Sequence, residues 1–257
     1  MSAPVVLLKL GGSLITDKAR PETPRPGTIR RLAAEVVEAL REPGAPRLVL
    51  GHGSGSFGHA AAARYGVHEG LAADSTEGRL DRLRGVSRVQ ERAAALHRRV
   101  LDALLAEGAA PFSVAPSSAL VAAGGVPARM EAEPLLLALE AGLLPVVYGD
   151  VVMDRERGWA IASTEAVFLA LAGELERRGV KVARALWAGA TDGILTPAGE
   201  RLDEVRADDA AEALAAAGGS AGTDVTGGMR HRLEAALELA RRGVPSLVFD
   251  ATVPGRL

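Results

Sequence analysis

The chain contains no cysteine. Disulfide bonds, thiolate metal sites and cysteine nucleophiles are therefore excluded together. Aromatic residues make up only 3% of the 257 residues, whereas 48% are hydrophobic, so a core must be built mainly from Ala, Leu and Val. This length fits one large α/β domain or two small ones, and either can bury a substantial core.

A large net charge and a long apolar run are also missing. The formal net charge is −2, which argues against a nucleic-acid-binding protein whose affinity comes from neutralising phosphates. No uninterrupted apolar stretch is long enough to span a bilayer, and no charged segment followed by an apolar one opens the chain. We therefore expect a soluble, cytoplasmic protein with neither a nucleic acid nor a membrane as partner.

Lysine is scarce, since only three of the thirty basic residues are lysine. Two of them, Lys9 and Lys18, bracket a glycine turn in the segment VVLLKLGGSLITDK. A retained lysine suggests a position that needs a compact ammonium group instead of a planar guanidinium. The apolar run 5–10 predicts a short buried strand, and the Gly-Gly-Ser that follows can turn backbone amides toward an anion. The alternative is an ordinary glycine turn flanked by two surface lysines.

Short apolar runs alternate with longer amphipathic segments along the whole chain, which is typical of a sheet with helices on both faces. The predicted strands are 5–10, 47–50, 112–115, 145–148, 182–187 and 246–250. The predicted helices are 28–41, 79–107, 131–141, 164–178, 207–217 and 229–242. A glycine in the left-handed conformation is expected at the end of four of them: Gly108, Gly142, Gly179 and Gly243. A hairpin with its turn at 154–158 divides the chain into an earlier and a later half.

The second predicted strand runs into GHGSGSFGH, residues 51–59. Three of its glycines satisfy GxGxxG, but no acidic residue ends a following strand, so a dinucleotide site is rejected. Small residues, successive amides and a helix expected to begin near His59 instead favour a phosphate cradle. His59 could donate a hydrogen bond to phosphate, the alternative being a structural histidine at a helix start. The same question applies with less support to His52, and the remaining histidines are expected at the surface or on helix faces: His68, His97 and His231.

Two later glycine clusters add candidate contacts. GATDGIL, residues 189–195, follows a predicted strand, and loops at strand ends are where open α/β sheets bind ligands, so Asp192 is a candidate nucleotide contact. GTDVTGGMRHR leads into the last predicted helix, where amides, the helix dipole, Arg230 and Arg232 could hold an anion. The alternatives are an isolated turn and a flexible loop before a helix with a solvated basic face.

Taken in this order, KLGGSLITDK, GHGSGSFGH, YGDVV and GTDVTGGM resemble the amino acid kinase superfamily and, within it, the isopentenyl phosphate kinases. The resemblance covers nearly the whole chain. It implies an α/β fold, an open three-layer αβα sandwich with a mostly parallel central sheet, as a single domain over 1–257 and usually a homodimer. It also implies that residues 1–160, approximately, bind the phosphoryl acceptor, and that residues 161–257 bind ATP, which would arrive with Mg²⁺.

The resemblance further implies a role for each matching residue. Lys9, Lys18 and His59 would be the catalytic residues, with Lys9 at the nucleotide phosphates and Lys18 on the phosphoryl group in flight. The ATP-binding residues would be Lys9, Gly11, Gly12, Ser13, Gly55, Asp192, Gly227 and Arg232. The acceptor-binding residues would be Ser54, Gly58, His59 and Gly149. No metal ligand from the protein is implied.

The sequence departs from the family pattern at three places. Arg232 stands where the family commonly has lysine, which keeps the charge but changes the reach. GATDG replaces the more common TDVDG, so Asp192 could match either acidic position. The helix after the hairpin begins ASTEAV instead of SGDD, which leaves the roles of Ser163, Thr164 and Glu165 open.

The expected reaction is phosphorylation of a small phosphate monoester by ATP, with isopentenyl phosphate, an intermediate of isoprenoid biosynthesis, becoming isopentenyl diphosphate. Phosphoryl transfer needs positioning and charge stabilisation more than covalent chemistry, and a phosphate monoester ionised near neutral pH can attack without a general base. Its apolar tail would need an apolar pocket, for which residues 60–83 are candidates. The alternatives are a fosfomycin-type phosphonate antibiotic kinase and a non-catalytic nucleotide-binding protein on the same fold.

Overall fold

A computed structural model describes residues 4–71, 76–195, 200–206, 208, 211, 213–215 and 228–257. Its main feature is a six-stranded sheet of order β12-β9-β1-β2-β6-β3, in which every neighbouring pair is parallel. The strands are β1 (Val5–Leu10), β2 (Arg47–His52), β3 (Pro111–Ser113), β6 (Leu144–Tyr148), β9 (Val182–Gly189) and β12 (Ser246–Asp250). These are the six predicted strands, with ends that differ by at most two residues, so the mostly parallel sheet is confirmed.

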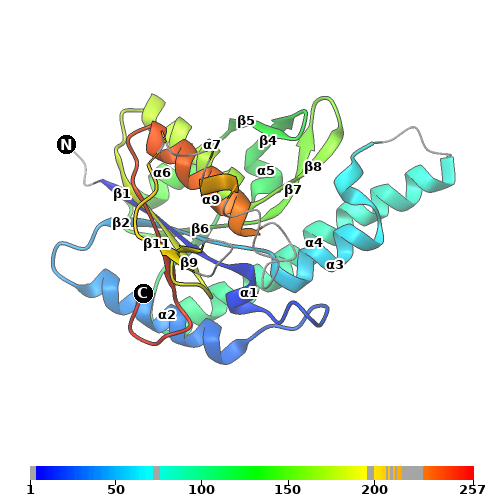
Figure 1. Cartoon of the computed structure of the whole chain (residues 1–257). Helices are drawn as coiled ribbons and strands as arrows, with labels where there is room; N and C mark the ends of the chain where they lie inside the picture. Colours follow the sequence, from blue (N-terminus) through cyan, green and yellow to red (C-terminus); the bar gives the residue numbers. More distant parts are fainter. Residues whose placement is uncertain are drawn as a thin grey trace.

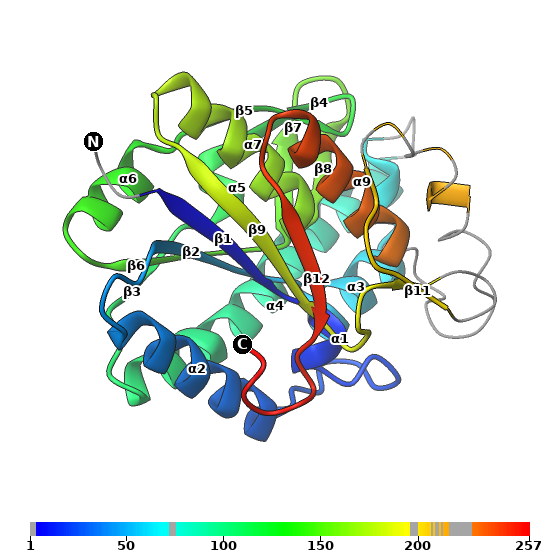
Figure 2. The same cartoon turned by 60° about the vertical axis from the view of Figure 1, so that its left-hand side comes forward.

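Helices cover both faces of this sheet (Figures 1 and 2). The helices α2 (Pro26–Arg41) and α4 (Thr76–Ala106) lie on one face. The helices α6 (Glu133–Glu140), α7 (Thr164–Arg177) and α9 (Gly228–Arg241) lie on the other. All six residues of β1 are buried, and they alternate between the layers, with Leu7 in the α7 side of the core and Leu8 in the α2 side. This burial on both faces explains why every residue of the strand except Lys9 is apolar, and it confirms the αβα sandwich.

A smaller four-stranded sheet has the order β5-β4-β7-β8. The strands β7 (Asp150–Asp154) and β8 (Gly158–Ala162) form the predicted hairpin. The predictions missed β4 (Leu120–Ala123) and β5 (Val126–Met130). Both are short, and β5 is an exposed edge strand that contains Pro127, which weakens its strand signal. Other short elements were also missed: α1 (Gly12–Ile15), η1 (Val67–Glu69), α5 (Pro116–Ala119), β10 (Ile194–Leu195) and β11 (Arg201–Leu202).

The predicted helix ends are confirmed at all four glycines, which have φ angles between 69° and 87°. The predicted helix 207–217 lies mostly outside the described residues. One prediction was wrong: the helix expected to begin near His59 is α3 (Gly55–Arg64), which begins four residues earlier. Gly55 has a φ of 52°, so it can turn the chain into the helix directly after Ser54. Within the described ranges, no helix is both long and apolar enough to cross a lipid bilayer.

The parallel strands place their carboxyl ends at one edge of the central sheet. There β1 lies between β2, which follows it in the chain, and β9, which comes from the later half. The strand order therefore reverses at β1, and the crevice at such a point is the usual ligand site of an open α/β sheet.

Candidate active site

The loops that follow β1 and β2 pack backbone against backbone at this edge. The Gly53 N–H donates to Leu10 O at 3.1 Å, and a Cβ on Gly12 would lie 2.8 Å from both N and Cα of Gly55. Thr16 joins the loops, because its hydroxyl donates to Gly12 O at 2.7 Å and accepts the Ser56 N–H at 3.0 Å. The glycines are therefore needed for close approach, and the two loops form one unit.

The loop after β1 has two amides for which the described part of the chain offers no acceptor. The Gly11 N–H donates to Ala188 O at 2.8 Å and so continues the sheet ladder. The N–H groups of Gly12 and Ser13 begin α1, and no residue in the described part of the chain accepts a hydrogen bond from either. These two amides are available to an anion at the end of β1.

The predicted acceptor contacts Ser54, Gly58 and Gly149 come together at the start of α3. Ser54 O accepts the Gly58 N–H at 3.3 Å, and a Cβ on Gly58 would lie 2.5 Å from Ser54 Oγ. Gly149, between β6 and β7, donates its N–H to His52 O at 3.0 Å, and a Cβ there would lie 3.5 Å from Ser54 N. The positive end of α3 is thus at Ser54, and His59 lies one turn further along, exposed.

Lys9 forms a buried ion pair with Glu165 of α7; the two residues are 7% and 6% exposed. Burial lowers the pKa of Lys9, and the Glu165 carboxylate opposes that shift. Burial acts to raise the pKa of Glu165, but the Lys9 ammonium lowers it overall, with help from Arg232. Glu165 is therefore ionised at neutral pH, and its carboxylate favours the charged form of Lys9.

Arg232 reaches the same place from α9. The residue is only 9% exposed. Its guanidinium lies over the ends of β1 and β9. A Cβ on Gly11 would lie 3.8 Å from Nη2, and a Cβ on Gly189 would lie 2.9 Å from Nη1. The predicted ATP contacts Lys9, Gly11 and Arg232 are thus brought together.

The start of α7 answers the question left open for residues 163–165. Ser163 caps the helix by accepting the Ala166 N–H at 3.2 Å. The Thr164 hydroxyl donates to His52 O at 2.6 Å and fixes the end of β2. Glu165 pairs with Lys9. Glu165 is a candidate site residue to which sequence reasoning gave no role, and its signal in the sequence was an acidic residue in the first turn of a helix.

Lys18 and His59 are exposed, yet both belong to this charge cluster. The loop that carries Lys18 is closed by a bridge between Thr16 and Pro24 and rests on α3 through the Glu22 N–H, which donates to Ser56 O at 3.2 Å. Partial burial lowers the pKa of His59, and the charges of Lys18 and Lys9 lower it further. His59 is therefore mainly neutral at neutral pH in the ligand-free protein.

Two predicted ATP contacts are less closely connected with this cluster. Asp192, after β9, is exposed and pairs with Arg201 at 3.4 Å and Arg256 at 3.1 Å. Gly227 lies outside the described residues, so its role stays a prediction. No group of three His, Asp or Glu side chains that could hold a metal occurs among the residues that the structure describes.

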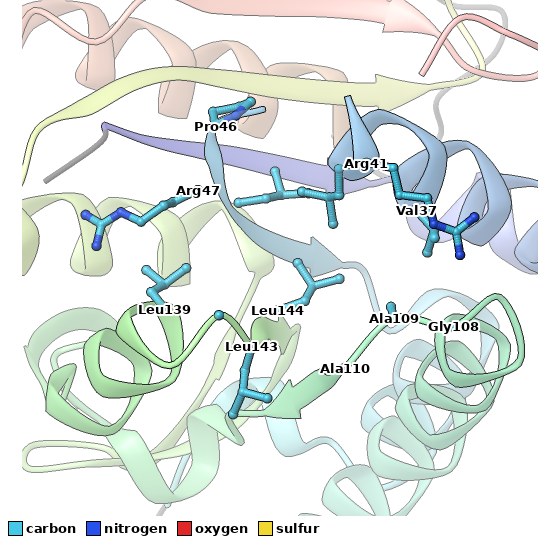
Figure 3. Close-up of a pocket in the computed structure, with 13 residues that line it drawn as sticks. Val37, Arg41, Pro46, Arg47, Gly108, Ala109, Ala110, Leu139, Leu143 and Leu144 are labelled. Carbon is cyan, nitrogen blue, oxygen red and sulfur yellow. The ribbon is translucent and has the colours of Figure 1, made fainter. Parts of the chain in front are cut away.

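A hollow of about 390 Å³ lies at the opposite edge of the sheet, next to the start of β2 (Figure 3). Its lining is largely aliphatic, with Arg41 and Arg47 at its sides, and it contains none of the predicted site residues. The chemistry of the motifs therefore lies at the carboxyl edge of the sheet and not in this hollow.

Comparison with known proteins gives a consistent result. The model of the amino acid kinase family matches residues 4–250. Isopentenyl phosphate kinase of Methanothermobacter thermautotrophicus is 33% identical, with 98% of this chain and 93% of the relative covered. The enzyme of the same name from Haloferax volcanii is 37% identical over 95% of this chain and 91% of its own. A crystal structure of isopentenyl phosphate kinase superposes with a TM-score of 0.80 at 30% identity, covering 98% and 93% of the two chains.

Proposed function

The chain belongs to the amino acid kinase family, and from this membership we propose that it transfers the γ-phosphoryl group of ATP to isopentenyl phosphate. Near full-length relatives named isopentenyl phosphate kinase support the acceptor. One observation carries the proposal: the buried Lys9–Glu165 pair lies at the carboxyl edge of the sheet, and the charges of Lys9 and Lys18 both act to lower the pKa of His59, which groups the three residues in one cluster. That cluster adjoins amides of two glycine loops, which is the composition a phosphate-to-phosphate transfer needs.

In the proposed reaction an oxygen of the acceptor phosphate attacks the γ-phosphorus of ATP. The bond from the γ-phosphorus to the bridging oxygen breaks, and ADP leaves. Lys18, on its exposed loop, stabilises the negative charge on the γ-phosphoryl group during its transfer. Glu165 holds Lys9 at the nucleotide phosphates. Because the acceptor is already ionised near neutral pH, no general base is required.

The acceptor phosphate lies at the start of α3 in this proposal. Neutral His59 donates one hydrogen bond to it, and Ser54, Gly58 and Gly149 leave room for close approach. Residues 1–160, approximately, would then form the acceptor lobe.

Residues 161–257, approximately, would form the ATP lobe. Arg232 contacts the end of β1 from α9, and its cation would lie at the ATP phosphates with Lys9. Gly12 and Ser13 would donate amides to the same phosphates, with Gly55 supporting that loop. Asp192 and Gly227 complete the proposed nucleotide contacts.

Magnesium, oligomeric state and location are further parts of the proposal. Mg²⁺ is usually held by substrate phosphates with one or two carboxylates. Asp192 is a carboxylate among the proposed nucleotide contacts and would hold the ion in place of its pairs with Arg201 and Arg256. When bound, the ion would neutralise phosphate charge. A homodimer in the cytoplasm is the state we propose, and sedimentation of the purified chain tests the oligomeric part.

An ADP-release assay with a panel of acceptors tests the proposed substrate. The purified chain is given ATP and Mg²⁺ with isopentenyl phosphate, fosfomycin, inorganic phosphate or no acceptor. We expect rapid ADP release with isopentenyl phosphate alone. Turnover of fosfomycin without turnover of isopentenyl phosphate would identify a phosphonate kinase, and ATP binding without acceptor-dependent ADP release would identify a non-catalytic protein.

A further inference from the structure

Two buried histidines, His52 and His97, and the exposed Ser113 form a series of hydrogen bonds behind the loop that follows β2. His52 Nδ1 lies 3.1 Å from Gly53 O, and His52 Nε2 lies 3.0 Å from His97 Nδ1. His97, on α4, has its Nε2 at 2.8 Å from Ser113 Oγ of β3. His52 is 0% and His97 4% exposed. The sequence predicted that His97 lies at the surface or on a helix face, and the structure places it on the buried face of α4.

The donor and acceptor of each of these hydrogen bonds can be assigned by starting from the Gly53 carbonyl oxygen. A carbonyl oxygen only accepts, so His52 Nδ1 carries the hydrogen that is donated to Gly53 O. His52 Nε2 is then the acceptor of a hydrogen from His97 Nδ1, and His97 Nε2 accepts from the Ser113 hydroxyl. Both imidazoles are neutral, and every donor points toward Gly53.

Stacking fixes the same rings in place. Tyr148 of β6 stacks on His97 with the ring centroids 4.2 Å apart, and on His52 at 5.7 Å. The His52 backbone is held as well, because its carbonyl oxygen accepts from both Gly149 and Thr164. The imidazole that contacts Gly53 O therefore cannot rotate without disturbing four elements.

The peptide between Gly53 and Ser54 is planar and trans, so its C=O and N–H point in opposite directions. Holding Gly53 O toward His52 turns the Ser54 N–H away from the imidazole. Among the described residues none accepts a hydrogen bond from that N–H, and Gly149 adjoins Ser54 N. The Ser54 amide is thus an aimed donor at the start of α3.

We propose that His52 and His97 are positioning residues, which orient the 53–54 peptide so that the Ser54 N–H binds the acceptor phosphate. The inference rests on the proposed function for the identity of the acceptor. The two hydrogen-bonded imidazoles, which we call the relay, are held by α4 and β3 and fix the direction of the Ser54 N–H before phosphate binds. Such a preset donor binds phosphate without the cost of ordering the loop.

Two pairs of variants test the proposal. His52→Phe keeps a ring for stacking but removes the donor to Gly53 O, whereas the amide nitrogen of His52→Asn can take the place of Nδ1. We expect His52→Phe to raise the KM for isopentenyl phosphate about tenfold to a hundredfold, the range of one hydrogen bond to a charged group. His52→Asn should stay within a few fold of wild type, and the KM for ATP should change less than about twofold in both.

The second pair keeps the proposal testable if a His52 variant does not fold. It changes His97, which is further from the loop after β2. His97→Phe removes the donor to His52 Nε2, and His97→Asn restores it. We expect a rise in acceptor KM of about threefold to tenfold for His97→Phe only. Thermal unfolding of all four variants reports any loss of stability separately from the KM values.

Calorimetric binding of inorganic phosphate separates this proposal from the proposed function. If wild type does not phosphorylate isopentenyl phosphate but His52→Phe still binds phosphate more weakly than His52→Asn, the relay stands and the assigned acceptor is wrong. Equal acceptor KM or phosphate affinity in His52→Phe and His52→Asn would overturn the relay, even if both are less stable. A wild-type chain that neither binds phosphate nor uses isopentenyl phosphate would contradict both proposals.

Discussion

Glu165 and Arg232 leave little space around the Lys9 ammonium group. This explains why the chain has lysine at this position although it uses arginine at most basic positions. A planar guanidinium is larger than an ammonium group and would meet Arg232 at the ends of β1 and β9. We expect Lys9→Arg to lower kcat/KM by at least about a hundredfold, on the order of the effect of one transition-state donor.

Steady-state kinetics with both substrates measures this effect. Lys181→Arg is the matched control, because Lys181 is the third lysine and is exposed. Full activity of Lys9→Arg would mean that the compact ammonium group is not needed, and the explanation of the lysine pattern would be lost.

His59 is expected to act mainly as a neutral donor, since burial and two nearby cations lower its pKa. His59→Ala should therefore raise the acceptor KM about tenfold to a hundredfold, the size of one hydrogen bond to a charged group. His59→Gln keeps a neutral donor near the position of Nε2 and should recover most of that loss at pH 7.5. Equal KM values for the two variants would contradict the neutral-donor role.

Local sequence identified some of the candidate site residues and missed others for a clear physical reason. Lys9, Lys18 and His59 stand beside glycine turns, and that context is visible within a few positions. Glu165 is 156 positions from its partner Lys9, so no local pattern connects them. The His52–His97 contact likewise joins a strand end to the middle of a long helix.

At the scale of elements, the two glycine loops act as a single packed unit. A Cβ on Gly12 would meet backbone atoms of Gly55 at 2.8 Å, which cannot move as a side chain could. Gly12→Ala should therefore destabilise the protein by about 1–3 kcal/mol, the usual cost of overpacking, and should lower activity as the loops separate.

Gly27 provides the control for this prediction. It lies in α2, and nothing is within 4 Å of the position of its Cβ. Gly27→Ala should be neutral or stabilise the protein by up to about 1 kcal/mol. Denaturant unfolding compares the two variants, and a Gly12→Ala protein as stable and active as Gly27→Ala would refute the packing argument.

The predictability of the elements followed their burial. Strands of the central sheet were found because both of their faces are apolar, as in β1. The edge strand β5 and the four-residue α1 carry no such signal. The start of α3 was misplaced because a glycine with positive φ opens it, a conformation that the sequence does not reveal.

At the scale of the whole molecule, the strand order brings the two halves of the chain together. The pairing of β1 with β9 places Lys9 beside residues from α7 and α9. The alternation of strands and helices predicted a sheet with helices on both faces, but it did not specify which strand would lie next to β1. That order depends on long-range packing, so the shared site could be inferred only from the family resemblance.

Stability should depend on pH through the buried histidines. Burial lowers the pKa of His52 from 6.5 to about 4, and the pKa of His97 is also lowered by burial and by His52. A group whose folded pKa is depressed binds its proton more readily in the unfolded chain, so stability is complete above about pH 6.5 and falls toward pH 4. For His52 alone the loss approaches about 3 kcal/mol.

Denaturant unfolding between pH 7 and 4.5 measures this loss. The lowered pKa values of Glu165 and Glu174 act mainly below that window. The double variant His52→Phe/His97→Phe should show a flatter dependence than wild type. A wild-type stability that is constant over the window would contradict the buried neutral pair.

The most direct test of the central claim is ³¹P NMR of the reaction of the purified chain with ATP, Mg²⁺ and isopentenyl phosphate. The proposed function predicts that the single phosphomonoester resonance of the acceptor is replaced by the two coupled resonances of a diphosphate as ADP accumulates. An unchanged acceptor resonance under conditions where the protein binds both substrates would contradict it.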